Sequence, residues 1–214
     1  MTAVPFLTGP AIAAFRCRWK VSGAGRGSNF LHAYRLVLPE QTIEERHMFH
    51  TISDFVHIWS RELEATQKVF KHLTDKSLST AVNPEGRTLA RLAWHIVTTM
   101  PEMMGKTGLT IAGTYENDPI PSSAKAIFTA YSNTAISLLE QVQASWTDAS
   151  LQITDDMYGE RWKRGDTLLS LVFHQIHHRA QMVVLMRQAG LGVPGIYGPT
   201  REEWAAFGRK PPEV

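Results

Sequence analysis

A chain of 214 residues, 43% hydrophobic and 20% charged, is long enough for one well-buried core but short for two full domains. Its one cysteine, Cys17, excludes an internal disulfide framework and a multi-cysteine zinc site, and fits a reducing, cytoplasmic location. The net charge is +2, yet residues 40–214 hold 17 basic and 20 acidic groups, which argues against a nucleic-acid partner. No apolar run is long enough to span a membrane, so we expect no membrane partner.

The first 47 residues differ from the rest of the chain. Residues 1–39 hold five basic residues and no acidic one, and they show no sustained helical period. We therefore expect residues 1–47 to be a poorly ordered extension that is dispensable to the fold. A targeting peptide and a translated region upstream of a true start at Met48 both explain this composition, and we favour the second. The glycines at 23, 25 and 27 lack the Gly-Lys-Ser/Thr ending of a phosphate-binding loop.

Two amphipathic segments follow. Between Met48 and His72, apolar residues recur at the spacing of one helix face, which predicts a first helix. Residues 83–86, Asn-Pro-Glu-Gly, then interrupt the helical pattern. Thr88 is a suitable N-cap for a second helix, and His95 lies within its apolar run. We therefore expect the His95 side chain to project into a helical bundle or along its edge.

The middle of the chain predicts two long connections around a third helix. Residues 106–121 contain two glycines and two prolines, and loops of this length often cover a functional site. The third helix is predicted from Ser122 or Ser123 to Trp146, because its apolar residues follow steps of three and four. Residues 147–165 form the second connection, in which we expect room for a short hairpin.

The fourth helix is predicted from a cap at Asp166 or Thr167 to Gly190. It is apolar nearly all round, so it must be covered on more than one side, as in a homodimer; cover by long loops is the alternative. A short helix is predicted from about Thr200, with Thr200 and Glu203 as a capping box. Residues 48–214 are thus predicted to form an all-α four-helix bundle with long crossover loops.

The fourth helix carries the sequence HQIHHRAQM, in which His174 and His178 are four residues apart. Their Cβ atoms would lie ~6 Å apart on one helix face, close enough for both rings to bind one metal ion. With His95 they would supply three neutral nitrogen donors, the number with which catalytic zinc sites leave a fourth position open. The alternative is that each histidine is merely hydrogen-bonded in the core or lies on the surface.

A family resemblance favours the metal. Residues 168–199, LLSLVFHQIHHRAQMVVLMRQAGLGVPGIYGP, resemble the last helix and tail of the DinB/YfiT-like family of four-helix-bundle metalloenzymes, whose motif is His-x-x-x-His-Arg-Gly-Gln. The LAWHIV segment around His95 resembles the ligand on that family's second helix. The resemblance covers roughly residues 48–207, with Ala180 in place of the motif's glycine. It implies that His95, His174 and His178 bind a divalent transition metal, with Zn or Ni ahead of Fe, Co or Mn.

Two functions compete. The resemblance implies a metal-dependent enzyme, a thiol-dependent transferase or a hydrolase, whose partners are a small-molecule electrophile and a low-molecular-weight thiol. The alternative is a non-catalytic stress-response protein in which the metal joins two helices. Ligands and fold do not decide between them, but an open coordination position beside a pocket would favour the enzyme.

Other polar residues have expected roles around this site. Gln181 lies one turn beyond His178 and could bond a ligand, a water or the substrate, and Arg179 could pair with a carboxylate of the fold or bind an anion. Both are candidate catalytic residues. The remaining expectations are a surface or supporting position for His177, solvated or capping positions for His57 and His72, core positions for Met103 and Met104, and pocket walls for Tyr115 and Glu116.

Overall fold

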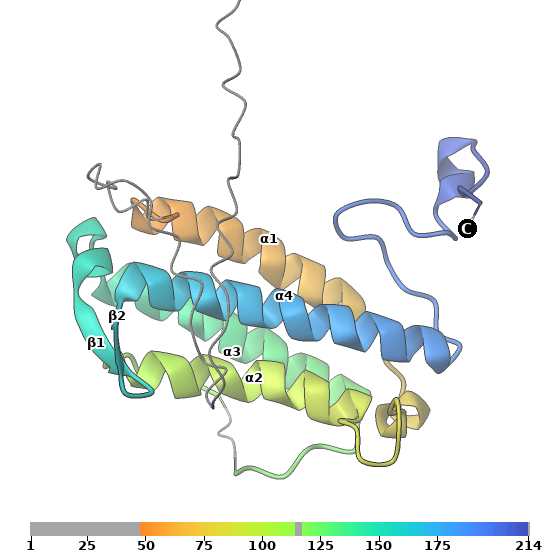
Figure 1. Ribbon diagram of the computed structural model, residues 1–214, viewed down its shortest axis with the longest axis horizontal. Helices are drawn as coiled ribbons and strands as arrows, with labels where there is room; N and C mark the ends of the chain where they lie inside the picture. The colour runs from red at the N-terminus through yellow and green to blue at the C-terminus, as the bar shows by residue number, and fades with distance from the viewer. Residues whose placement is uncertain (1–47, 114–116, 214) are drawn as a thin grey trace, which may run out of the picture. The chain divides into compact units, whose positions relative to one another are not determined.

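The computed structural model describes residues 48–113 and 117–213, so the predicted extension at residues 1–47 lies outside it, as do Tyr115 and Glu116. The described residues form four α-helices, which lie side by side with roughly parallel axes (Figure 1). This arrangement confirms the predicted all-α four-helix bundle. The elements in chain order are α1 (Ile52–Phe70), η1 (Asp75–Ser79), α2 (Leu89–Gly105), α3 (Ala124–Ser145), η2 (Asp148–Gln152), β1 (Thr154–Met157), β2 (Glu160–Lys163), α4 (Arg164–Gln188) and η3 (Trp204–Phe207).

The connections determine which helices are neighbours. α2 and α3 run in the same direction, because the segment between them passes back along the bundle before α3 begins (Figure 1). α2 packs between α3 and α4, and α1 packs against the same two helices from the other side. Residues of α2 and α4 that are far apart in the sequence are therefore brought face to face.

The helices begin where the sequence provides caps. At α1, the Thr51 hydroxyl accepts a hydrogen bond from the Asp54 amide, and the Asp54 carboxylate accepts one from the Thr51 amide. At α2, the Thr88 hydroxyl accepts from the Arg91 amide, as predicted. Ser123 caps α3, within the predicted start, and that helix ends one residue before Trp146. Short-range capping therefore accounts for three of the four helix starts.

Large side chains fill the centre of the bundle. Trp59 of α1 is fully buried, and its indole nitrogen donates a 3.0 Å hydrogen bond to the Ala135 carbonyl of α3. Met103 and Met104 of α2 are buried too, which confirms their predicted place in the core. This packed interior gives α2 and α4 fixed positions relative to each other.

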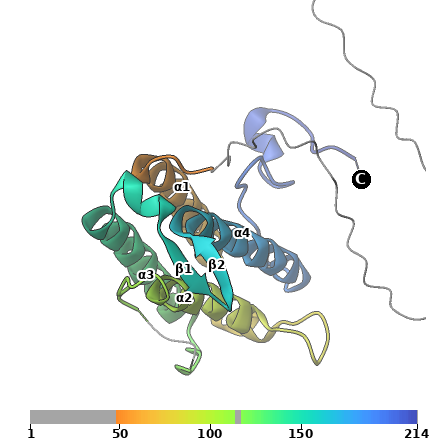
Figure 2. The same cartoon turned by 60° about the vertical axis from the view of Figure 1, so that its left-hand side comes forward.

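The start of α4 differs from the prediction. β1 and β2 pair as an antiparallel hairpin, with Thr154 opposite Lys163, and Figure 2 shows the hairpin at the end of the bundle where α4 begins. The predicted caps Asp166 and Thr167 are wrong, since α4 begins at Arg164 with Lys163 as its N-cap. The cause is tertiary: the Arg164 amide donates to the Ile153 carbonyl at 2.9 Å, so the hairpin fixes the start of the helix.

The tail after α4 also differs in part. The predicted short helix from Thr200 is a 3-10 turn at Trp204–Phe207. Half of the expected capping box is present, because the Glu203 carboxylate accepts from the Thr200 amide at 2.8 Å. The Thr200 hydroxyl has no hydrogen-bond partner among the described residues. Glu203 instead uses its second oxygen to hold the Gly195 amide at 2.9 Å.

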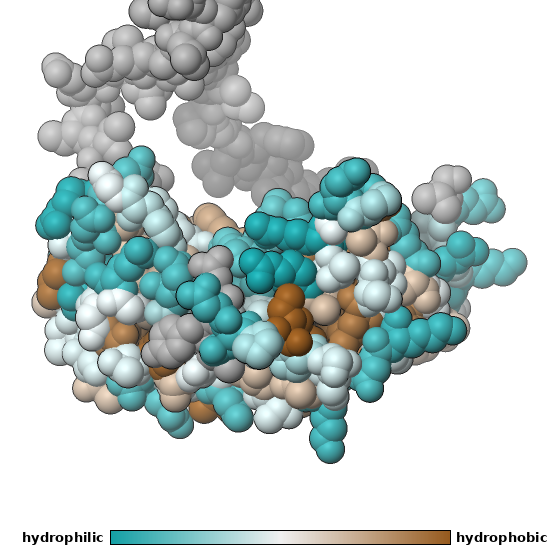
Figure 3. All heavy atoms as spheres, turned by 90° about the horizontal axis from the view of Figure 1, so that it is seen from below, coloured by the Kyte–Doolittle hydropathy of each residue, from teal (hydrophilic) through white to brown (hydrophobic). Residues whose placement is uncertain are grey.

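The surface is mixed in polarity. The face seen from the side of α2 carries hydrophobic side chains in small groups among polar ones (Figure 3). Across the described residues, no helix is both long enough and apolar enough to cross a membrane.

Candidate metal centre

The three predicted histidines converge between α2 and α4. The Nε2 atoms of His95 and His174 lie 3.0 Å apart, and one nitrogen from each of His95, His174 and His178 lies within 4.8 Å of the others. Among the described residues this is the group of three that could hold a metal ion. The i,i+4 pair on α4 and its partner on α2 thus form one donor set, as the sequence predicted.

Burial keeps these imidazoles neutral. It lowers the pKa of His95 and of His174 to about 4, and it also lowers the pKa of His178. The positive charge of Arg87 contributes to all three shifts. A neutral imidazole has the free lone pair that metal binding requires, so the donor set fits a divalent transition metal.

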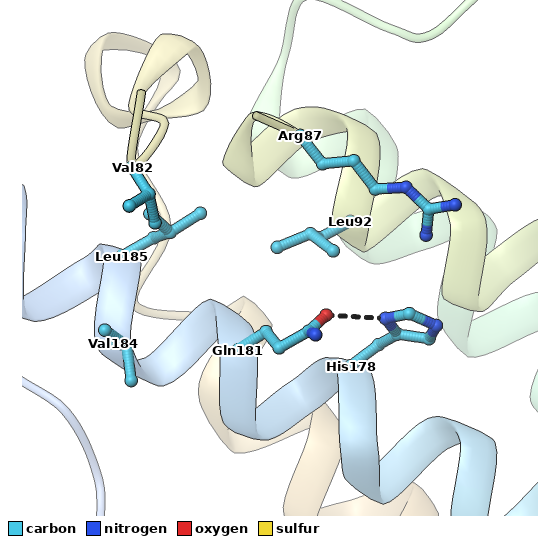
Figure 4. A pocket seen from close by; sticks show the side chains of 7 residues that line it. All are labelled: Val82, Arg87, Leu92, His178, Gln181, Val184 and Leu185. Atoms are coloured by element: carbon cyan, nitrogen blue, oxygen red, sulfur yellow. Dashed lines mark hydrogen bonds between the residues drawn. The ribbon is translucent and has the colours of Figure 1, made fainter. Parts of the chain in front are cut away.

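Gln181 fixes the orientation of His178. Its Oε1 lies 2.8 Å from the His178 Nδ1, so that nitrogen carries the proton and donates, while Nε2 keeps its lone pair (Figure 4). The amide nitrogen of Gln181 lies 3.1 Å from the Nε2 of His177, which is exposed. The expected contact of Gln181 with a ligand residue is therefore present, and His177 has the expected supporting position.

We expect replacement of Gln181 by leucine to weaken metal binding about 10- to 100-fold, because His178 loses the acceptor that holds its ring and tautomer. Gln181→Glu keeps an acceptor oxygen and serves as the control. Metal competition with a chelator of known affinity measures the effect. Equal affinities for the leucine variant and the native protein would show that the hydrogen bond does not position His178.

We expect the metal-free protein to become less stable as the pH falls from about 6.5 to about 4. Folding lowers the pKa of His95 and His174 from 6.5 to about 4, so in this range the unfolded chain binds more protons than the folded one. Thermal midpoints of chelator-treated protein across this range test the effect. A His95→Gln, His174→Gln double variant should show a shallower slope, and an unchanged slope would contradict the assignment.

Arg179 lies away from the histidine donors. It is buried against α1, where its Nη2 lies 2.7 Å from the Glu62 carboxylate and its Nη1 donates to the Thr66 hydroxyl at 3.0 Å. The Tyr197 hydroxyl, from the tail, bonds both Arg179 and Glu62. Of its two predicted roles, the structure thus places Arg179 in the ion pair of the fold.

The two histidines of α1 are separate from this site. Both His57 and His72 are exposed. His72 Nδ1 lies 2.8 Å from the Lys68 carbonyl at the end of α1, which is the expected capping role. Ala180, which replaces the glycine of the family motif, is exposed. The three donors converge with this substitution in place.

A cavity of about 410 Å³ opens beside His178 (Figure 4). Its walls come from the segment between η1 and α2, from α2 and from α4. Sequence analysis did not predict a role for this segment or for Arg87, although Arg87 directly precedes the predicted cap Thr88. The lining residues are Val82, Arg87, Leu92, His178, Gln181, Val184 and Leu185.

Comparison with known proteins identifies the family. The sequence model of the DinB family matches residues 48–213, which include all three histidines. The chain belongs to the DinB family. The DinB chain is 42% identical over 167 residues to the uncharacterized protein YrdA of Bacillus subtilis (strain 168), across 78% of this chain and 100% of YrdA.

Solved structures agree with this DinB assignment. The crystal structure of a DinB-like protein from Bacillus cereus ATCC 10987 is 45% identical, with a TM-score of 0.68. It covers 70% of this chain and 100% of that one. A second DinB-like protein, YjoA of Bacillus subtilis, is 19% identical with a TM-score of 0.53, covers 66% of this chain and 96% of its own, and supports the fold alone.

Proposed function

We propose that this DinB family protein is a metal-dependent enzyme, a thiol-dependent transferase or a hydrolase that acts on a small electrophile. The observation that carries the proposal is the cavity of about 410 Å³ that is lined by His178, one member of the three-histidine donor set. Its volume is within the range of small-molecule sites. Three protein ligands beside a cavity are typical of catalytic metal sites, whereas structural sites have four.

Each part of the site has a separable task. A divalent metal ion bound by His95, His174 and His178 would lower the pKa of a bound water or thiol and so supply a nucleophile at neutral pH. Gln181 holds His178 in the tautomer that presents Nε2. Leu92 and Leu185 supply apolar walls that the electrophile would contact.

The test combines metal analysis with an activity screen. Purified protein is assayed for metal content, then for thiol conjugation of a chromogenic chloronitroarene with a panel of low-molecular-weight thiols, and for hydrolysis of nitrophenyl esters. Turnover that requires the metal and disappears in His174→Ala would support the enzyme. Stoichiometric metal that raises the thermal midpoint, with no turnover in any assay, would favour the structural metal of a non-catalytic protein.

We further propose that the protein is a homodimer. On α4, Ile176 and Val183 are half-buried and Val184 is 55% exposed, so the described residues of one chain leave part of this apolar helix uncovered. Light scattering at micromolar concentration should give twice the mass of the chain. A monomeric mass would contradict the dimer and would favour the alternative, in which loops of the same chain cover α4.

A further inference from the structure

The cavity beside the histidines combines an apolar lining with one cation. Apolar surface comes from Leu92 of α2, from Val184 and Leu185 of α4, and from Val82 of the segment before α2 (Figure 4). The Arg87 side chain ends on the same side of the cavity as the His178 ring. A ligand that fills this space would therefore meet apolar contacts along its length and a positive charge near the metal donors.

The segment that carries Val82 and Arg87 is held in place by its own hydrogen bonds. The Leu89 amide donates to the Thr80 carbonyl at 2.9 Å and closes the segment at its base. Within it, the Gly86 amide donates to the Asn83 carbonyl at 3.0 Å. A Cβ atom on Gly86 would lie 3.2 Å from the Asn83 carbonyl oxygen, so the backbone of this turn leaves little room for a side chain there. The wall is thus preformed, which lowers the entropic cost of binding.

Arg87 is a cation without a partner in the described part of the chain, where no hydrogen bond or ion pair joins its guanidinium to another side chain. Arg179, by contrast, is neutralised by Glu62. The charge of Arg87 is felt at the histidines, since it adds to the effect of burial in lowering the pKa of each. A positive potential at a cavity lined by neutral donors attracts an anion.

We propose that this cavity binds small apolar molecules that carry one oxyanion, and that Arg87 is the residue that binds the oxyanion. A guanidinium offers two parallel N–H donors that match a carboxylate or a phosphoryl group. Among the described lining residues the cavity has one arginine, and this single charge together with the apolar walls favours a monoanion, a carboxylate above all. The inference rests on the proposed function, because it assigns the substrate class of the same site.

The experiment uses the full-length, metal-loaded protein and matched probes. Titration calorimetry compares 4-phenylbutyrate with its neutral amide, and 3-phenylpropylphosphonate, which has the same phenylpropyl chain, distinguishes a carboxylate from a phosphoryl source. We expect 4-phenylbutyrate to bind about 10- to 100-fold more tightly than the amide. Arg87→Ala should remove this preference, whereas Arg87→Lys should keep part of it as a point charge. Arg61→Ala, which removes an exposed arginine of α1, is the control and should leave the preference unchanged.

The outcomes separate this inference from the proposed function. A preference for either anion that depends on Arg87 supports the inference. The anion that binds more tightly shows whether the ligand carries a carboxylate or a phosphoryl group. Equal affinity for acid and amide, or a preference that survives in Arg87→Ala, overturns it. Metal-dependent turnover of neutral electrophiles without any anion preference would leave the enzyme in place and remove only the inference. The same titration on chelator-treated protein completes the separation. If the metal-free protein still prefers the anion and Arg87→Ala removes that preference, the inference stands even where the proposed metal-dependent activity fails.

Discussion

His174→Ala should leave the purified protein without stoichiometric metal. The substitution removes one of three nitrogen donors, and neither His95 nor His178 has a described carboxylate or thiol beside it that could replace the lost one. Loss of a directly bound ligand should exceed the ~10- to 100-fold cost of losing an outer hydrogen-bond partner. Elemental analysis after dialysis should give about one metal ion per native chain and close to none for His174→Ala.

The controls for this result come from the same residue type. His95→Ala and His178→Ala should behave like His174→Ala, because the site needs donors from both helices. His57→Ala removes an exposed imidazole from α1 and should keep the native metal content. Native occupancy in any one of the three site variants would refute the assignment of that histidine as a ligand.

Arg179→Ala should lower stability far more than it changes metal content. Arg179 is 2% exposed and Glu62 is 7% exposed, so the substitution leaves a buried carboxylate without a counter-charge. Breaking such a pair costs about 3–5 kcal/mol. For a body of this size that corresponds to a thermal midpoint lower by about 10 °C or more. Thermal unfolding of chelator-treated protein measures this effect without a contribution from the metal.

A double replacement tests the cause. In Glu62→Leu, Arg179→Met both charges are removed together, so no buried charge remains and the loss of stability should be smaller. Tyr197→Phe, which removes only the hydroxyl shared by the pair, should cost about 1 kcal/mol. If Arg179→Ala instead lost its metal while keeping its midpoint, Arg179 would act at the metal centre.

The features that the sequence predicted well are those that depend on nearby residues. The caps at Thr88 and Ser123 are local hydrogen bonds, so residue type and spacing were enough to place the starts of α2 and α3. The histidine pair on α4 follows from helical periodicity alone. The inward position of His95 could be predicted because its helix is amphipathic. The family resemblance then predicted that His95 shares one site with His174 and His178.

The features that the sequence did not predict depend on distant contacts. α4 begins two residues before the predicted cap Asp166 because pairing of β1 with β2 positions Arg164, and no local signal encodes that pairing. For Arg179 a pairing with a carboxylate of the fold was one of two predicted roles, but the partner was not predicted, because Glu62 lies 117 residues away on α1. The position of Arg87 at the cavity depends on the conformation of the segment before α2, which a hydrogen bond between Thr80 and Leu89 closes.

The separation of the donors along the chain links metal capture to folding. His95 and His174 are 79 residues apart, with the α2–α3 crossover, α3 and the hairpin between them. Closing a flexible loop of that length costs about 4 kcal/mol of chain entropy, which the packing of α2 against α4 must first overcome. An unfolded chain would therefore bind an ion at these histidines weakly, and the folded chain would bind it more tightly. During refolding, the uptake of metal would accordingly mark the moment at which α4 docks, and bound metal would slow the separation of the two helices.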